Sequence, residues 1–403
     1  MDRFPAFGAL RHHDFRLLWM GLFVSAIGTW MQIFAQALLV LHITGGSSFA
    51  LGLVSAPFAL AFFVFAPAGG AVADRYDKRR LLLITQGLLT AMATGLGVLA
   101  FLNLVTLWFM VVFAFFGGAI LSFDQPARSA LVPSLVPPGE IMNAISLQSI
   151  IFSGASTFGP ALAGIAFTYV GYAGNFLLNA ASYLAVIVAL WRMRAIRRPP
   201  ARAHEPLWAS VRAVLKTAGR DAALPWVMTG YGALLFLGPS PAVMLPVFGL
   251  EVLHLTAAQL GLLFSAIGVG TILGGLAVAS LGDYRRKGWL FLSTLLLWAA
   301  ALGVFAASKV FWYSIVALLI LGGTQNAAGA TAVTLMQTRV PPQMRGRIMG
   351  LNTLLVMGFR PLGDFPAGAL IGLIGAPLTA GIAAGLTGVY GLFVAARRGL
   401  RDA

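Results

Sequence analysis

Long apolar stretches alternate with short polar segments along the whole chain. Each stretch is about 20 residues long, the length that an α-helix needs to cross about 30 Å of bilayer hydrocarbon at about 1.5 Å per residue. The pattern predicts an all-α integral membrane protein. Its twelve predicted transmembrane helices lie near residues 16–41, 49–73, 81–101, 104–132, 144–170, 175–192, 225–250, 257–281, 289–307, 310–337, 348–373 and 377–396.

The second half of the chain repeats the pattern of the first half about 200 residues later. A pair of glycines precedes a basic cluster in each half, at residues 69–70 and at residues 274–275. Parallel repeats of six hydrophobic segments are typical of transporters. We therefore predict two pseudo-symmetric six-helix bundles, at residues 1–191 and 225–403, joined by a cytoplasmic linker at residues 192–224.

Composition agrees with this pattern. Hydrophobic residues make up 59% of the 403 residues and charged residues only 10%, against roughly 25% charged residues in soluble domains. The absence of cysteine excludes disulfides, thiolate metal sites and cysteine nucleophiles. Because the sequence contains no metal-ligand cluster, no phosphate-binding loop and no recognisable nucleophile with its base, we predict no metal, no cofactor and no enzymatic activity.

The formal net charge of +15 would also suit a nucleic-acid-binding protein, but the positions of the basic residues indicate another cause. Apart from Arg128, Lys309 and Arg360, all of the 27 lysines and arginines fall in segments that the predicted spans place on one side of the membrane. This asymmetry follows the positive-inside rule. We predict a multi-pass protein of the cell (inner) membrane with both termini cytoplasmic, and no nucleic-acid partner.

The loop between the second and third spans carries a family resemblance. From Gly70 to Arg80 it reads Gly-x-x-Ala-Asp-Arg-x-x-Lys-Arg-Arg, which resembles the signature loop of the major facilitator superfamily of transporters. Further motifs make nearly the whole chain similar to the enterobactin-exporter type (transmembrane secretion effector) of efflux protein. These motifs are Phe15-Arg16-Leu17-Leu18-Trp19, Asp124-Gln125-Pro126-Ala127-Arg128-Ser129-Ala130 and Asn143-Ala144.

The resemblance implies a secondary active transporter that works by alternating access, in the first instance a proton-coupled exporter of a small organic molecule such as a siderophore or a drug. An importer of a small solute or a lipid translocator would use the same fold. A membrane sensor or a membrane enzyme is disfavoured, because no signalling domain or catalytic spacing is present. The expected partners are a small-molecule substrate, protons and the lipid bilayer, and the expected state is a monomer.

The signature loop contains the candidate gating residues. Asp74 lies at a predicted helix end, where a carboxylate can accept hydrogen bonds from unpaired N–H groups at the N-terminus of another helix. The resemblance implies that Asp74 closes the cytoplasmic gate by binding near residues 346–349, at the start of span 11. A basic cluster that only sets topology is the alternative. The full gating motif is Gly70, Asp74, Arg75, Arg79 and Arg80.

Span 5 contains a proline among small residues, Gly159, Pro160 and Gly164. Proline removes a backbone hydrogen bond and bends a helix, and small residues allow close packing where the two halves meet. The segment resembles the antiporter motif of the superfamily, which implies efflux.

Two pairs of opposite charges with a spacing of four fall within predicted spans, Arg360 with Asp364 and Asp124 with Arg128. This spacing places both members on one helix face, so each pair can form an ion pair. A charge at hydrocarbon depth costs at least about 2.5 kcal/mol, which makes all four residues candidates for proton coupling. The alternatives are a structural pair in span 11 and, in span 4, a gate-side salt bridge or snorkelling of Arg128.

The resemblance also implies a central path lined chiefly by spans 1, 4, 7 and 10. Amides within a bilayer seek partners and aromatic rings supply apolar contact area, so the mixture suits an amphiphilic or aromatic substrate. Packing between helices is the alternative for each residue. The candidate cavity residues are Trp30, Gln32, Gln36, Tyr231, Phe236, Gln325 and Asn326.

Overall fold

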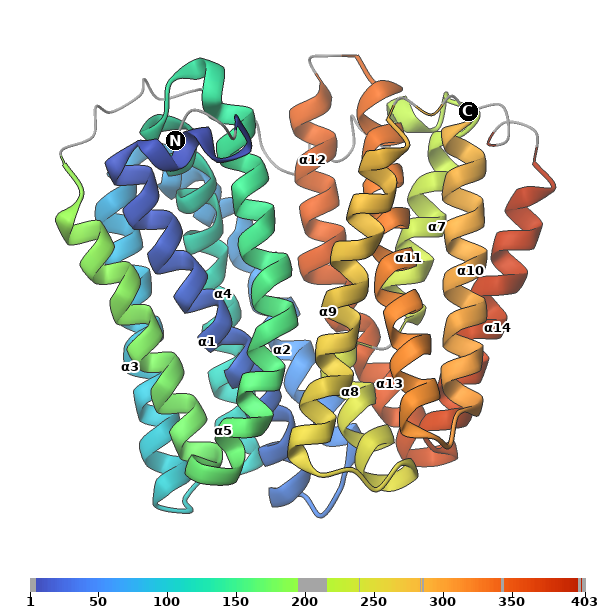
Figure 1. Ribbon diagram of the computed structural model, residues 1–403, viewed down its shortest axis with the longest axis horizontal. Coiled ribbons are helices and arrows are strands. Elements are labelled where there is room, and N and C mark those ends of the chain that lie inside the picture. Colours follow the sequence, from blue (N-terminus) through green and yellow to red (C-terminus); the bar gives the residue numbers. More distant parts are fainter. Residues whose placement is uncertain are drawn as a thin grey trace.

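The protein forms two groups of helices that stand side by side (Figure 1). The predicted linker at residues 192–224 falls largely on residues 195–215, which lie outside the described residues. The described part of the chain contains helices and no β-strand. The computed structural model describes residues 5–194, 216–238, 240–282, 284, 286–341, 344–397 and 400.

The N-terminal group holds the first half of the predicted spans. Short side chains cap several of its helices: Ser47 accepts from the backbone N–H of Ala50, and Asp77 from that of Arg80. The elements of this group are η1 (Pro5–Arg11), α1 (His13–Ile43), α2 (Ser48–Arg75), α3 (Lys78–Phe101), α4 (Leu107–Leu131), η2 (Val132–Leu135), η3 (Pro138–Glu140) and α5 (Ile141–Arg192).

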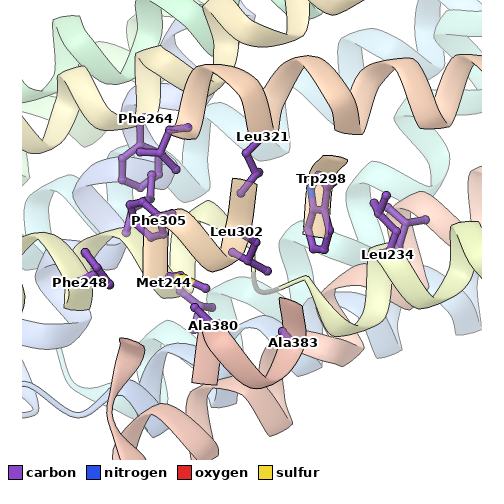
Figure 2. Close-up of a cluster of buried hydrophobic side chains, with 14 of the residues drawn as sticks. Leu234, Met244, Phe248, Phe264, Trp298, Leu302, Phe305, Leu321, Ala380 and Ala383 are labelled. Atoms are coloured by element: carbon purple, nitrogen blue, oxygen red, sulfur yellow. The ribbon is translucent and has the colours of Figure 1, made fainter. Parts of the chain in front are cut away.

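The C-terminal group is built around buried aromatic and aliphatic side chains, of which Trp298 and Phe305 are among the largest (Figure 2). Its elements are α7 (Leu224–Leu237), α8 (Pro241–Val247), the π-helical turn η4 (Phe248–Val252), α9 (Ala257–Ser280), α10 (Lys287–Ala307), α11 (Phe311–Thr338), α12 (Arg345–Leu354), the π-helical turn η6 (Leu355–Phe359), α13 (Arg360–Ile374) and α14 (Ala376–Ala395).

Helix α5 contains two membrane spans that reverse at Gly171. The φ of this residue is 58° and its ψ is −155°, a conformation that glycine adopts without a steric cost. After the reversal the chain runs back along α1, since Ser182 lies against Gly28 and the later Ala189 lies against the earlier Gly21. Spans 5 and 6, predicted as separate helices, are therefore joined by a one-residue reversal.

The number of spans agrees with the prediction. Eleven helical segments of the described chain are long and apolar enough to cross a membrane. One of them, Pro138–Arg192, has 55 residues, or about 80 Å of helix, more than twice the hydrocarbon thickness. Counted as two spans because of the reversal at Gly171, it brings the total to the predicted twelve.

Two of the predicted spans are interrupted in the structure, at residues 225–250 and 348–373. In the first, α-helix ends at Leu237 and resumes at Pro241, and in the second the turn η6 separates α12 from α13. A proline opens α8 and another follows Arg360 at the start of α13, positions where the missing N–H costs no hydrogen bond. Single π-helical turns occur often at functional sites.

The two groups of helices meet along two pairs, α5 with α9 and α2 with α13. Small residues allow the approach: Gly164 lies against Ala257, and Gly268 lies against Thr157. On α5 these contacts fall at residues 157–164, toward the reversal and away from the start of the helix. Figure 1 shows the groups closest at the lower end and separated at the upper end, where both termini lie.

Candidate functional site

A cavity of about 490 Å³ lies between the two groups of helices. The N-terminal group supplies most of its wall, from α1 to α5, and the C-terminal group supplies residues of α8, η6 and α13. Aromatic and aliphatic side chains form most of the lining. Its polar and charged members are Ser25, Thr29, Gln32, Gln36, Ser55, Gln125, Arg128, Tyr183 and Asp364.

Helix α1 places three of the predicted cavity residues in this wall, Trp30, Gln32 and Gln36. Asn179 of α5 donates a hydrogen bond of 2.6 Å to the side-chain oxygen of Gln32. That bond fixes the direction of the Gln32 amide, because it engages the acceptor end and leaves the amide nitrogen free to donate. Gln32 is therefore a hydrogen-bond donor with a fixed orientation.

An ion pair within α4 faces the same cavity. Arg128 donates to the carboxylate of Asp124 over 2.5 Å, and the side chain of Asp124 is 0% exposed whereas that of Arg128 is 25% exposed. Thr85 and Gln86 of α3 donate to the other carboxylate oxygen of Asp124, at 2.8 and 2.7 Å. Three donors therefore satisfy the buried carboxylate, an arrangement that compensates for its lost hydration. The positive group of the pair, Arg128, lines the cavity.

Asp364 faces the cavity from the opposite wall. Its side chain is buried, and it accepts a hydrogen bond of 2.9 Å from the backbone N–H of Ser240, in the break between α7 and α8. No ion pair within 4.0 Å joins Asp364 to Arg360, although the spacing of four predicted one. One oxygen of Asp364 is instead bonded to the backbone N–H of Ser240, the N-cap of α8, and this bond orients the carboxylate toward the helix break.

Four predicted cavity residues lie elsewhere in this conformation. Asn326 donates to the backbone carbonyl of Thr271, and the ring of Phe236 packs on that of Phe359 with centroids 5.1 Å apart. These are packing contacts inside the C-terminal group. Tyr231 is likewise buried, and Gln325 lines a separate small pocket inside the same group.

The gating motif lies at the end of the molecule where the termini are. Gly70, Asp74 and Arg75 belong to the last turns of α2. Arg79 donates to the backbone carbonyl of Trp191 over 3.0 Å, and the backbone N–H of Arg80 is capped by Asp77. Arg79 thus joins α3 to the end of α5.

The proline motif of span 5 lies at the contact between the two groups. The only residue of α5 with non-helical backbone angles is Gly171, so Pro160 lies in helical backbone. Its carbonyl lies against Gly261 of α9, and Gly164 lies against Ala257. Gly159 instead packs on Trp30 within the N-terminal group. The small residues of this motif therefore allow close contacts on both sides of α5.

Sequence reasoning missed the residues that support the site. Thr85, Gln86 and Asn179 are polar residues inside apolar spans, and that signal was available. Ser240 acts through its backbone N–H in a helix break, for which Gly238 and Pro241 were the available signal. Tyr183 lines the cavity, and its hydroxyl lies 3.3 Å from that of Thr29.

Twelve membrane spans form two groups around a cavity that is lined in part by the charged side chains of Arg128 and Asp364. This architecture is that of a secondary transporter. The protein class is therefore a membrane transporter with the major facilitator fold. The chain belongs to the transmembrane secretion effector family, whose model matches residues 5–401.

Several curated proteins and solved structures are similar to the chain. The enterobactin exporter EntS of Citrobacter koseri is 28% identical over 388 residues, which cover 95% of this chain and 90% of that protein. The enterobactin exporter of Salmonella typhimurium is also 28% identical over 388 residues, with the same coverage. Among solved structures, the nucleoside transporter NupG has a TM-score of 0.76 at 14% identity, and the match covers 95% of this chain and 98% of that one. A bacterial homologue of ferroportin in the inward-facing state has a TM-score of 0.72 at 17% identity, with coverages of 95% and 99%.

Proposed function

We propose that this protein exports a siderophore-like or drug-like small organic molecule by alternating access, and that protons drive the export. The observation that carries the proposal is the central cavity. Its volume of about 490 Å³ lies in the range of about 300 to 1,000 Å³ that is usual for small-ligand pockets. Its wall combines Trp30, Phe152 and Gln32 with the cation Arg128, a mixture that suits an aromatic molecule with acceptor oxygens. The similarity to enterobactin exporters supports the direction of transport.

We assign the protein to the inner membrane with both termini in the cytoplasm, on the strength of the positive-inside distribution. In that orientation the groups of helices are in contact on the outer side and separated on the cytoplasmic side (Figure 1). The structure then corresponds to the inward-facing state, in which the cavity receives substrate from the cytoplasm. Residues 1–191 and 225–403 are the two bodies that rock against each other, and residues 192–224 link them. The proposed working unit is a monomer, because residues of one chain line the whole cavity. Transport by alternating access needs no enzymatic activity.

Asp364 is the proposed proton-coupling carboxylate, and Arg360 adjusts its charge balance. Asp364 lines the cavity from the C-terminal group. It lies beside the contact of α2 with α13, since Gly52 packs against the backbone carbonyl of Asp364. Movement of α2 over α13 therefore changes the surroundings of Asp364. The pair of Asp124 and Arg128 is the second candidate for proton coupling. In this proposal the pair fixes the position of Arg128, which presents a positive charge to the substrate.

The gating motif has its role in the opposite conformation. When the cytoplasmic side closes, the carboxylate of Asp74 approaches the start of α12 near residues 346–349, where the positive end of the helix dipole favours a negative charge. Such a contact contributes about 0.3 to 2 kcal/mol. Arg75, Arg79 and Arg80 keep this loop at the anionic inner surface of the membrane.

Everted vesicles test the function directly. Their cytoplasmic face is outward, so an exporter accumulates added enterobactin or a fluorescent drug, and a pH gradient increases the uptake. Right-side-out vesicles separate export from import, because an importer accumulates substrate only there. Failure of both vesicle types to accumulate any of a panel of catecholate, hydroxamate and cationic aromatic compounds would contradict the proposal.

A further inference from the structure

A second, smaller pocket lies inside the C-terminal group and shares no lining residue with the central cavity. Its volume of about 20 Å³ is enough for a single particle of about the size of a water molecule. Apolar side chains of α8, α9, α10 and α11 form most of the wall, and three of them, Met244, Leu302 and Phe305, are visible around Trp298 in Figure 2.

Three polar side chains line this pocket, each from a different helix: Trp298 of α10, Gln325 of α11 and Arg360 of α13. Trp298 is only 2% exposed, and its indole Nε1–H has no hydrogen-bond partner in the described part of the chain. Such buried, unsatisfied donors are rare in proteins, because the lost hydration is not replaced. The unsatisfied indole N–H of Trp298 therefore indicates a missing acceptor at this pocket.

The positive charge of Arg360 likewise indicates that a negatively charged partner is missing. Its nearest acidic neighbour along the helix, Asp364, accepts from the backbone of Ser240 and is not within ion-pair distance. Within the described ranges, no hydrogen bond or salt bridge engages the guanidinium of Arg360 or the amide of Gln325. A guanidinium in the interior of a membrane protein normally has an anionic or carbonyl partner.

A water molecule would leave the positive charge of Arg360 without a counter-charge in this pocket. Indole and guanidinium groups only donate, so a water would accept from Trp298 and Arg360 and would then need acceptors for its own two hydrogens. The side-chain amide oxygen of Gln325 is the one polar side-chain acceptor among the lining residues, and the other side chains are Leu, Ile, Phe, Met and Pro. An anion accepts from all three groups and also neutralises Arg360, so the donor set favours an anion.

We propose that this pocket binds one small monovalent anion, of the size of chloride or bromide, between α10, α11 and α13. The anion replaces Asp364 as the counter-charge of Arg360, which allows Asp364 to change its protonation without leaving an unpaired cation in the membrane. Binding needs no transported substrate, and the pocket is a site apart from the substrate cavity.

Thermal unfolding of the purified full-length protein in detergent tests the site. Chloride is varied against gluconate at constant ionic strength, because gluconate is too large for a pocket of about 20 Å³. A ligand that binds only the folded state raises the unfolding temperature in a saturable way. We expect such a rise with chloride and with bromide and no rise with gluconate.

Variants assign the effect to this pocket. Arg360→Gln should abolish the chloride dependence, and Trp298→Phe should raise the half-saturating chloride concentration about tenfold or more, since it removes one hydrogen bond to a charged group. Trp312→Phe is the matched control, because Trp312 is 70% exposed on α11 and should keep the wild-type dependence.

Equal unfolding temperatures in chloride and gluconate would overturn the proposal, as would an unchanged chloride dependence in Trp298→Phe. Trp298→Phe keeps the test decisive if Arg360→Gln does not fold. No transport assay enters the measurement, so its outcome is separate from that of the proposed export function.

Discussion

Ser48 at the start of α2 donates a hydrogen bond of 3.0 Å to the backbone carbonyl oxygen of Gly368 in α13, 320 residues further along the chain. One turn later, Gly52 lies against the backbone of Asp364 and Phe365. The contact between the two groups of helices therefore reaches the backbone of the proposed coupling residue. It depends on backbone atoms and small residues, so the addition of side-chain volume is a direct way to disturb it.

A methyl group at Gly268 should weaken the contact of α9 with α5. An added Cβ would lie 2.6 Å from the Cα of Thr157, so one of the two helices has to move. Overpacking of this kind costs about 1 to 3 kcal/mol. It should change the ratio of the two conformations about 5- to 150-fold, toward the state in which α5 and α9 are apart. Distances between spin labels on α5 and α9 measure the change. Gly87→Ala is the control, because its added Cβ meets nothing within 4 Å, and an identical distance distribution in Gly268→Ala would contradict the prediction.

Single cysteines should distinguish cavity residues from packing residues. The chain contains no cysteine, so each substitution creates a unique thiol. Gln32→Cys and Gln36→Cys should react with a water-soluble thiol reagent in the inward-facing state, because both positions line the cavity. Phe236→Cys and Asn326→Cys should react at least about tenfold more slowly, because these side chains pack inside the C-terminal group and a reagent reaches them only after a local opening of at least about 1.4 kcal/mol. Protection of Gln36→Cys would remove α1 from the substrate pathway.

Neutralising Asp124 should destabilise the protein. Asp124→Asn leaves Arg128 without its partner and weakens the hydrogen bonds from Thr85 and Gln86. Breaking a buried pair costs about 3 to 5 kcal/mol. Asp124→Asn combined with Arg128→Gln should recover part of that loss, since it leaves no unpaired charge. Thermal unfolding in detergent measures both, and a double variant that is no more stable than Asp124→Asn alone would contradict this account.

Neutralising Asp364 should remove proton-driven accumulation. In Asp364→Asn no carboxylate at this position on the C-terminal wall can bind or release a proton, yet the amide can still accept from the N–H of Ser240. Substrate binding and exchange without a gradient should persist. Vesicle uptake with and without a pH gradient measures the separation. If Asp364→Asn retains gradient-driven uptake, the coupling carboxylate is not Asp364 and Asp124 becomes the candidate.

The stability that the pair of Asp221 and Arg339 contributes should depend on pH only in the acidic range. Burial alone would raise the pKa of Asp221, but the backbone N–H groups of Ala223 and Leu224 and the guanidinium of Arg339, at 3.3 Å, outweigh burial and lower it. A lowered pKa stabilises the fold above the unfolded value of about 3.9, and the gain is lost as pH falls through the folded pKa.

Asp221→Asn should therefore lower stability at pH 7 by about 0.2 to 1 kcal/mol, the range of exposed or partly exposed pairs. The difference between wild type and variant should stay constant from about pH 5 to pH 8 and shrink below about pH 4. Unfolding curves at several pH values measure it. A difference that varied between about pH 6 and pH 8 would show that another group titrates.

The sequence pattern predicted the number and approximate positions of the membrane spans well, because hydrocarbon thickness imposes a length on every span. It also predicted the pair of Asp124 and Arg128, which depends only on spacing within one helix. The same spacing failed for Arg360 and Asp364, because the partner of Asp364 is a backbone N–H 124 residues away. The break between α7 and α8 and the turn η6 do not interrupt the apolar run of the sequence, so continuous spans were expected there.

Cavity residues were predictable on α1 and not on α7 or α11. Gln32 and Gln36 are one turn apart on a long helix without a break. Phe236 lies at the end of α7, where the chain leaves the helix, and its ring packs on η6 instead. Asn326 faces α9 because it donates to the carbonyl of Thr271. Tertiary partners decide such orientations, and a single sequence does not contain them.

The uneven wall of the cavity has an evolutionary consequence. Most of the side chains that would touch a substrate belong to α1 to α5, whereas glycines and backbone atoms form the closest contacts between the groups of helices. Mutations that alter the range of transported compounds can therefore accumulate in the N-terminal group without disturbing the movement itself. Relatives that carry different cargoes should diverge at positions equivalent to Gln32 and Gln36 and retain small residues at those equivalent to Gly52 and Gly268.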